Sequence, residues 1–379
     1  MMPIRSLHVR GYRSVLSVFL RLGQVNVLVG PNGCGKSNLY RSLYLLSVAA
    51  EGRLARSLAQ EGGMPSCLWA GELRRKAPKR VTIDVGFDQW SYRFSCGLPG
   101  AAASGSAFSL DPFVRQEELW FHDRGRLVSV FKRRNGSAQL RDDAGQLIDF
   151  PLALSDSESI LSELREPHRF PELSALRSVL LGWRFYHQFR TDEESPLRRP
   201  QIAVRTPVLA NDGADLAAAL QTILEIGDAG ALNTSVASAF DGARMEIATS
   251  RGGMEVNLEP RHFRRRFSAR ELSDGTLKYF CLLAALLSPR PPTLLAINEP
   301  DANLHPQLYE PLARMVARAS QHSQLWITTH SQALADLLEQ HAGALVIPLS
   351  LENGATLASG VVDEEPSDDV SNGDQDDES

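Results

Sequence analysis

The stretch from Gly30 to Ser37, Gly-Pro-Asn-Gly-Cys-Gly-Lys-Ser, constrains this chain more than any other part of its sequence. It matches the phosphate-loop pattern G-x-x-x-x-G-K-[ST], which requires a strand before it and a helix after it. Residues 25–29, Val-Asn-Val-Leu-Val, predict a buried strand, and the residues from Asn38 onward predict a helix. Backbone N–H groups in such a loop converge on an anion, and the helix dipole favours negative charge at the same point. The sequence therefore predicts a polyphosphate site in an α/β fold.

Two side chains of this loop have chemistry of their own. Lys36 is expected to reach the β- and γ-phosphates, and the Ser37 hydroxyl is expected to hold Mg²⁺. The loop alone does not say which family of phosphate-loop proteins this is.

Composition is that of a soluble globular protein, with 379 residues of which 22% are charged. The first residues contain no apolar signal core, and the longest apolar run, Cys281 to Leu287, is too short to span a bilayer. We expect a cytoplasmic protein that does not contact a membrane by itself. The four cysteines are far apart without a C-x-x-C pair, so they predict neither a zinc site nor a disulfide framework: Cys34, Cys67, Cys96 and Cys281.

The last segment, residues 363–379, carries nine acidic residues and no basic one. Removing these nine negative charges from the net charge of −5 leaves +4 on the rest of the chain. A segment so rich in Asp, Glu and Ser cannot bury enough apolar surface to order itself, so we expect a disordered tail. Solubility is its simplest role, and competition with nucleic acid for a basic groove is the alternative.

Residues 1–150 have the pattern of a β-rich lobe that contains the phosphate loop. The alternation from Ile4 to Val9 and the run from Val15 to Leu22 predict two antiparallel edge strands. The helix after Ser37 is expected to end near Gly52. Alternation from residue 81 to 147, with turn signals at Asn135-Gly136 and Ala144-Gly145, predicts an antiparallel meander.

Residues 151–270 predict a helical insertion with connecting strands. Helical spacing covers residues 156–182, a short strand is expected at 183–186, and Asp212-Gly213 is expected to begin a capped helix. Strand-like runs follow at 244–248 and 254–258. The run from Arg261 to Phe267 mixes basic and aromatic residues, which suits either an amphipathic strand or a contact to a phosphate backbone.

Residues 271–350 contain five stretches that belong together. A helix start, Leu272-Ser273-Asp274-Gly275-Thr276, can present N–H groups to a γ-phosphate of a second molecule. A buried strand at 293–297 ends in Asn298-Glu299-Pro300, and a carboxylate at that end of a strand is suited to orienting an attacking water. An acidic loop from Asp301 follows, and a strand at 325–329 leads to His330.

The order of these motifs resembles that of the ATP-binding-cassette ATPases. Residues 7–14, Leu-His-Val-Arg-Gly-Tyr-Arg-Ser, and Asn298-Glu299-Pro300 followed by Leu-His-Pro resemble the RecF-type and chromosome-maintenance branch, here without a coiled-coil arm. The motifs cover residues 4–38 and 270–331, and the middle of the chain matches only in type. The resemblance implies a single head at 1–360, with a parallel core sheet, an antiparallel β subdomain and a helical lobe.

The resemblance also implies roles for individual residues, with ATP and Mg²⁺ as the ligands. Glu299 would be the catalytic base, and His330 would sense the γ-phosphate together with Lys36. Leu272, Ser273 and Gly275 would form a signature that completes the site of a second copy, and Asp301 would communicate between the two copies. The nucleotide would be held by Gly30, Asn32, Gly33, Gly35, Lys36, Ser37, Asn38 and Arg13.

Two positions depart from the family's pattern. Asn298 stands where an Asp usually binds Mg²⁺, and because Mg²⁺ prefers hard anionic ligands, we expect weaker metal binding or slow turnover. Ser37 and Asn298 are nevertheless the candidate metal ligands. The family's glutamine loop has no clear match: Gln188 is one candidate, and Gln201 competes with it.

Three functions are compatible with this reading. The first is an ATP-hydrolysing homodimer that acts on DNA in repair or recombination. The second is a regulatory ATPase subunit of a partner effector such as a defence nuclease, with slow or no hydrolysis; the residues after His330 contain no nuclease pattern. The third, the motor of a transporter, is disfavoured by the opening strand and by Asn298-Glu299-Pro300.

Overall fold

The computed structural model of the chain describes residues 2–72, 78–99, 106–142, 145–151, 153–250 and 253–359. The acidic tail from residue 363, and Ala144 of the second turn signal, lie outside these ranges. Among the described residues, no helix has both the length and the apolar character needed to cross a membrane.

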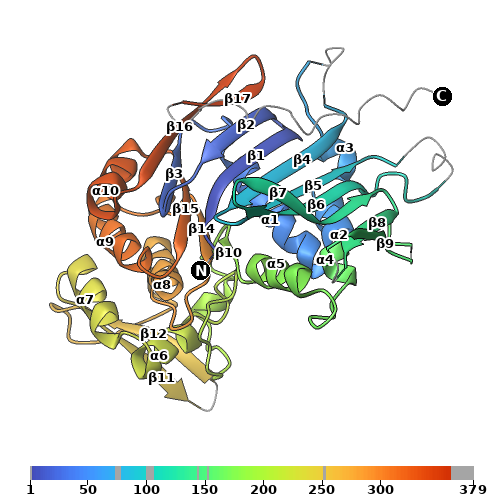
Figure 1. Cartoon of the computed structure of the whole chain (residues 1–379). Helices are drawn as coiled ribbons and strands as arrows, with labels where there is room; N and C mark the ends of the chain where they lie inside the picture. The colour runs from blue at the N-terminus through green and yellow to red at the C-terminus, as the bar shows by residue number, and fades with distance from the viewer. Residues whose placement is uncertain are drawn as a thin grey trace.

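A large antiparallel sheet forms one layer of the molecule (Figure 1). Its strand order, β2-β1-β4-β5-β6-β7-β8-β9, confirms the meander expected from the alternating pattern. Of the two strands expected at an edge, β2 lies there, but the expectation is wrong for β1, which pairs with both β2 and β4. The strands are β1 (Ile4–Tyr12), β2 (Val15–Arg21), β4 (Arg80–Phe87), β5 (Trp90–Gly97), β6 (Phe113–Asp123), β7 (Arg126–Arg134), β8 (Ser137–Arg141) and β9 (Leu147–Asp149).

A second sheet forms the parallel core of the fold, in the order β10-β14-β15-β3-β16-β17. Its first five strands are parallel, and β17 pairs antiparallel with β16. Strands buried on both faces are continuous apolar runs, and the burial of every residue of β3 and β15 fits this rule. The strands are β3 (Val25–Val29), β10 (Arg184–Tyr186), β14 (Leu294–Asn298), β15 (Gln324–Thr329), β16 (Leu345–Glu352) and β17 (Ala355–Ala358).

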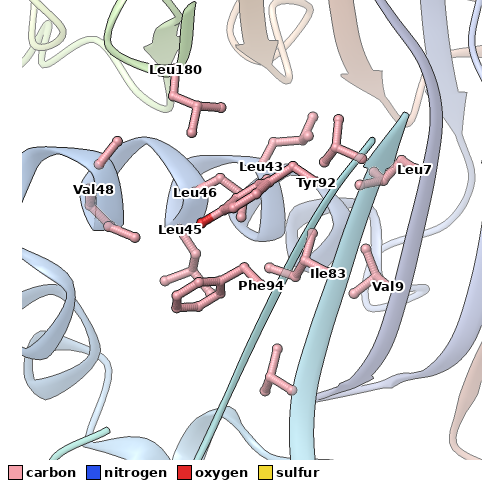
Figure 2. Close-up of a cluster of buried hydrophobic side chains, with 14 of the residues drawn as sticks. Leu7, Val9, Leu43, Leu45, Leu46, Val48, Ile83, Tyr92, Phe94 and Leu180 are labelled. Atoms are coloured by element: carbon pink, nitrogen blue, oxygen red, sulfur yellow. The ribbon is translucent and has the colours of Figure 1, made fainter. Parts of the chain in front are cut away.

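Helix α1 (Lys36–Glu51) packs between the two sheets. Figure 2 shows its leucines, among them Leu43 and Leu46, against Ile83 and Phe94 of the antiparallel sheet, with Leu180 on the other side of the helix. The helix ends at Gly52, whose φ of 80° is accessible mainly to glycine. The smaller helices of this layer are α2 (Leu54–Gln60), α3 (Met64–Cys67), α4 (Ile160–Glu163) and α5 (Pro171–Leu181).

The opposite face of the parallel sheet is covered by α8 (Asp274–Leu286), α9 (Tyr309–Ala319) and α10 (Gln332–Ala342) (Figure 1). This core is continuous with a separate lobe made of α6 (Leu216–Ile226), α7 (Ala229–Ala239) and a small sheet of β11 (Arg244–Ser250), β12 (Gly253–Glu259) and β13 (Phe267–Ser268). The predicted helical lobe and antiparallel subdomain are therefore present.

Two details of this lobe differ from expectation. Of the two interpretations of 261–267, the amphipathic strand is wrong except at its end, because residues 261–266 form turns and bends and only Phe267 and Ser268 pair with β12. The helix expected from Asp212 begins at Leu216, and Asp215 does not cap it. The Gln201 side chain supplies the acceptor instead: its Oε1 accepts a hydrogen bond from the Ala217 N–H at a donor–acceptor distance of 2.7 Å.

Candidate nucleotide-binding site

The phosphate loop connects β3 to α1, as the motif requires. Gly33 and Gly35 have φ of +81° and +103°, which L side chains rarely adopt. A methyl group on Gly30 would overlap the Leu349 carbonyl oxygen, and one on Gly35 would overlap the Thr356 hydroxyl. Strands β16 and β17 therefore pack directly against the loop, and its glycines serve both its conformation and this close approach.

Lys36 is the first residue of α1 and is almost fully buried, with 4% of its side chain exposed. Its ammonium donates to the carbonyl oxygens of Gly30 at 2.8 Å and Pro31 at 3.0 Å. These bonds fold the lysine across the mouth of its own loop. Its charge is thereby held where the phosphates of a nucleotide are expected.

A short chain of hydrogen bonds fixes the start of α1 to both ends of the sequence. Asn38 Nδ2 donates to Ser14 Oγ at 2.8 Å, and Ser14 Oγ lies 2.7 Å from Thr356 Oγ1. The Thr356 N–H also donates to the Ser14 carbonyl at 2.7 Å. Asn38 thus has a structural partner in this conformation, and Thr356 is a supporting residue that no motif indicated.

The carboxyl ends of β14 and β15 meet beside this loop. Thr328 Oγ1 donates to Asn298 Oδ1 at 2.8 Å, and the Glu299 N–H donates to the Thr328 carbonyl at 2.9 Å. Thr328 therefore orients the Asn298 amide, with its oxygen accepting a hydrogen bond. The Glu299 carboxylate lies 4.0 Å from the Lys36 ammonium.

Glu299 has a φ of +46°, an unfavourable conformation for any residue except glycine. Lys278 of α8 stabilises this turn, because its ammonium donates to the carbonyl oxygens of Glu299 at 2.8 Å and Ala302 at 2.7 Å. Burial lowers the pKa of Lys278 to about 8, although the nearby Asp301 and Glu299 carboxylates oppose the shift. No sequence motif indicated that this residue lies at the site.

Asp301 and His330, which follow the ends of β14 and β15, contact each other. The Asp301 side chain is fully buried, and its Oδ2 lies 3.2 Å from His330 Nδ1 without the geometry of a hydrogen bond. Within the described residues, neither carboxylate oxygen has a hydrogen-bond donor. In this conformation Asp301 contacts its own protomer's His330, and the half-exposed imidazole is the group that can reach outward.

A cavity of about 550 Å³ connects these elements. It contains Ser37, Asn298 and Glu299, together with Gln188 and the signature-helix residues Asp274 and Lys278. Gln188 lines the cavity, whereas Gln201 does not: it caps α6 and pairs with Met254. His187 also contributes to the cavity, and burial lowers its pKa.

Arg13, which precedes Ser14 in the turn between β1 and β2, is held by a buried carboxylate. Glu61, 7% exposed, accepts from Arg13 Nη2 and Arg41 Nη1, each at 2.5 Å, and from the Tyr12 hydroxyl at 3.0 Å. Arg13 itself has a φ of 50°. One carboxylate thus fixes two cations and the turn between β1 and β2.

The signature occupies the start of α8. Leu272 is buried in the core, and Ser273 is the exposed N-cap, accepting from the Thr276 N–H at 3.2 Å. A Cβ on Gly275 would lie 2.7 Å from the Asn303 carbonyl oxygen, so glycine permits close contact with the loop after Glu299. Ser273 does not contact the cavity, and it is open to solvent and to a second chain.

Comparison with known families identifies the chain. A protein-family model described as "AAA domain, putative AbiEii toxin, Type IV TA system" matches residues 25–336, from the strand before the phosphate loop to α10. The chain belongs to this family. A search of curated proteins finds no match to this AAA-domain protein.

Solved structures confirm the fold class. The SMC head bound to the C-terminal winged-helix domain of ScpA is 14% identical and matches with a TM-score of 0.53, covering 94% of this chain and 97% of the other. An SMC head from Pyrococcus furiosus matches with a TM-score of 0.52 at 12% identity and covers 94% of this chain and 96% of that structure. An SMC head from Pyrococcus yayanosii matches with the same TM-score at 11% identity and covers 94% of this chain and 97% of that structure. At these identities the match concerns fold alone. The AAA-domain protein therefore has the ATP-binding-cassette type of P-loop fold, and its RecF-like branch stays a prediction.

The residues present fit a nucleotide with Mg²⁺. The loop's glycines leave its N–H groups accessible, Lys36 supplies a charge at its mouth, and the Ser37 hydroxyl and Asn298 amide meet in one cavity. These are oxygen ligands of the kind that Mg²⁺ takes. The AAA-domain protein is thus a nucleotide-binding member of the P-loop ATPases.

Proposed function

We propose that this protein hydrolyses ATP slowly, as an ATP-dependent homodimer that acts on DNA. The observation that supports hydrolysis most directly is the Glu299 carboxylate, 4.0 Å from the Lys36 ammonium and in the same cavity as Ser37. A carboxylate at this point can accept a proton from a water that attacks the γ-phosphate. Lys36 and His330 would stabilise the charge that develops on the transferred phosphoryl group.

Mg²⁺ would neutralise charge on the β- and γ-phosphates, with Ser37 and Asn298 as its protein ligands. Asn298 contributes an oxygen but no charge, which is the reason for proposing slow turnover. Thr328 supports this arrangement because its hydroxyl donates to Asn298 Oδ1 and leaves one lone pair of that oxygen available.

Dimerisation is proposed from the signature. Ser273 is exposed at the start of the helix, and neither Ser273 nor the half-buried Gly275 lines the cavity of its own chain. A second copy related by two-fold symmetry would bring each helix start to the other copy's phosphate loop, so that both sites close only when ATP is bound. We propose a role in DNA repair or recombination on the resemblance to the RecF-type branch.

The test uses Glu299→Gln, which keeps the shape of the side chain and removes the base. With ATP and Mg²⁺ it should accumulate as a dimer in light scattering, while wild type returns to monomer as ATP is consumed. Ser273→Arg should bind ATP but stay monomeric, and Lys36→Ala should lose nucleotide binding. If Glu299→Gln binds ATP yet remains monomeric, the composite site is wrong.

A second candidate is a regulatory ATPase that serves a partner effector. It is favoured by the family description, which names a toxin–antitoxin system, and by the SMC head structures, two of which contain a bound ScpA domain. This function predicts ATP-dependent binding of a protein encoded beside this chain. Glu299→Gln should retain that complex, and added DNA should not change its affinity.

A further inference from the structure

An exposed patch of arginines surrounds a groove at the outer end of the lobe that contains β11 and β12. The groove, about 390 Å³, is formed by Gly242, Arg244, Glu259, Pro260, Arg261 and Phe263. Arg264 follows in the same turn, and all three arginines are exposed. We call this surface, Arg244, Arg261, Phe263 and Arg264, the Arg-Phe patch.

The arginines of the patch differ from their neighbours in having no anionic partner. Arg265 pairs with Glu271 at 2.7 Å, and Arg266 pairs with Glu246 at 2.5 Å. Within the described residues, no ion pair involves Arg244, Arg261 or Arg264. The Arg261 stem lies against Gly242, where a Cβ would be 3.4 Å from its Cδ. Three positive charges are therefore available to an external anion.

Phe263 is the unusual member of the patch, because 60% of this aromatic residue is exposed. Its ring packs against the Phe267 ring in a T-shaped, edge-to-face arrangement, with a centroid distance of 5.1 Å and an interplanar angle of 69°. The Arg265 guanidinium in turn covers the Phe267 ring at 4.6 Å. Phe267 thus supports one side of the Phe263 ring, while much of the Phe263 surface remains free to contact a ligand.

We propose that the Arg-Phe patch binds a single-stranded nucleic acid, with phosphates on Arg244, Arg261 and Arg264 and one base stacked on Phe263. Unpaired arginines along a groove suit a phosphate backbone, and a supported aromatic ring suits an unstacked base. Duplex DNA keeps its bases stacked and can use only the arginines. This inference names the substrate class for the DNA-binding part of the proposed function, but it requires neither hydrolysis nor dimerisation.

The experiment measures fluorescence anisotropy of a labelled oligodeoxythymidine and of a blunt duplex of equal length, with the full-length, nucleotide-free protein. Phe263→Leu should weaken single-strand binding roughly tenfold and leave duplex binding unchanged, because stacking contributes about 1–3 kcal/mol per base. Phe263→Trp should keep the wild-type affinity. Equal effects of Phe263→Leu on both ligands, or none on either, would overturn the assignment.

The arginines are tested together as Arg244→Gln, Arg261→Gln and Arg264→Gln in one variant. The slope of log affinity against log salt should become shallower by about 2, since each contact to a single-strand phosphate contributes about 0.7. The matched control changes three other exposed arginines that have no ion pair within the described residues: Arg56, Arg126 and Arg290. It removes the same charge and should keep the wild-type slope.

Heparin, a polyanion without bases, tests the alternative that the patch binds any polyanion or an acidic protein surface. If both arginine variants lose heparin and oligonucleotide binding equally, only net charge matters and the patch is not a nucleic-acid site. Failure of the proposed dimer can be distinguished from failure of the patch. If Glu299→Gln stays monomeric while oligonucleotide binding still depends on the Arg-Phe patch, only the dimer is contradicted. A normal Glu299→Gln dimer without patch-dependent binding contradicts the patch alone.

Discussion

Lys278 should control the rate of hydrolysis with little effect on stability. Its ammonium donates to the carbonyl oxygens of Glu299 and Ala302 and so holds Glu299 at a φ of +46°. A non-glycine residue in this region costs about 1–3 kcal/mol. Without the two bonds, Lys278→Met would populate the observed Glu299 conformation about 5- to 150-fold less, and kcat should fall by that factor.

The effect on folding is expected to be small because two contributions oppose each other. The Lys278 pKa of about 8, against 10.5 for an ordinary lysine, means that burial, after the opposing effect of the Asp301 and Glu299 carboxylates, disfavours the charged form by a net amount of about 3 kcal/mol. Two hydrogen bonds from a charged donor contribute a similar amount, about 1.5–3 kcal/mol each. Lys278→Met should therefore unfold within a few degrees of wild type.

The pKa also predicts how the two proteins diverge with pH. Between pH 8 and 10.5 the unfolded chain holds a proton on Lys278 that the folded chain has lost, so stability rises with pH relative to Lys278→Met. Denaturant titrations at pH 7 and 10 measure this difference.

The catalytic part is measured by steady-state hydrolysis and by binding of a fluorescent ATP analogue. We expect kcat to fall while nucleotide affinity stays within about twofold, since Lys278 contacts backbone rather than the phosphate loop. Lys278→Arg retains a donor and should recover part of the rate. An unchanged kcat in Lys278→Met would refute the argument that the ammonium positions Glu299.

Three further outcomes follow from the same contacts. Asn298→Asp should tighten Mg²⁺ roughly tenfold in Mg²⁺-dependent nucleotide titrations, because it adds charge and still accepts from Thr328; no gain would mean that Asn298 is not a ligand. Arg133→Met should destabilise the fold by about 3–5 kcal/mol in denaturant unfolding, since it leaves the fully buried Glu117 carboxylate, 3.0 Å from Arg133, without its cation. Thr356→Val should cost about 1 kcal/mol of stability and weaken nucleotide binding severalfold, and an unaltered affinity would show that the β17 contact does not support the loop.

The phosphate loop and the strand ends could be predicted because their determinants are local. Glycines at φ of +81° and +103° are required by the loop itself, and the apolar runs of β3, β14 and β15 are required by burial on both faces. The antiparallel meander followed from alternation in the same way. Each of these features is decided within about ten residues of sequence.

Lys278 and Glu61 could not be predicted because their roles depend on distant parts of the chain. Lys278 reaches the Glu299 carbonyl only through the packing of α8 beside β14, and Glu61 meets Arg13 across 48 positions of sequence. A lysine on a helix and a glutamate in a loop are ordinary surface residues until tertiary contacts bury them. Gln201 was misleading for the same reason, since its side chain could reach either a phosphate or the Ala217 N–H.

The run from 261 to 267 was ambiguous for a different reason. Its alternation of aromatic and basic residues is typical of a strand, but the Phe263 N–H donates to the Pro260 carbonyl at 3.2 Å and closes a turn instead. A turn releases Phe263 and Arg264 from the alternation that a strand would impose, so Phe263 lines the groove and the next residue, Arg264, is also exposed. The aromatic and basic residues whose alternation is typical of a strand are therefore the residues proposed to contact a base and phosphates.

The support for the phosphate loop comes from both ends of the chain, and this has a consequence for how the site is assembled. Gly35 cannot carry a side chain, both because its φ is +103° and because the Thr356 hydroxyl occupies the space where a methyl group would lie. Thr356 in turn is bonded to Ser14, and Ser14 to Asn38 at the start of α1. The loop geometry described is therefore supported by the contact with β17. Although the motif is local in sequence, its phosphate-binding conformation depends on a strand more than three hundred residues further along the chain.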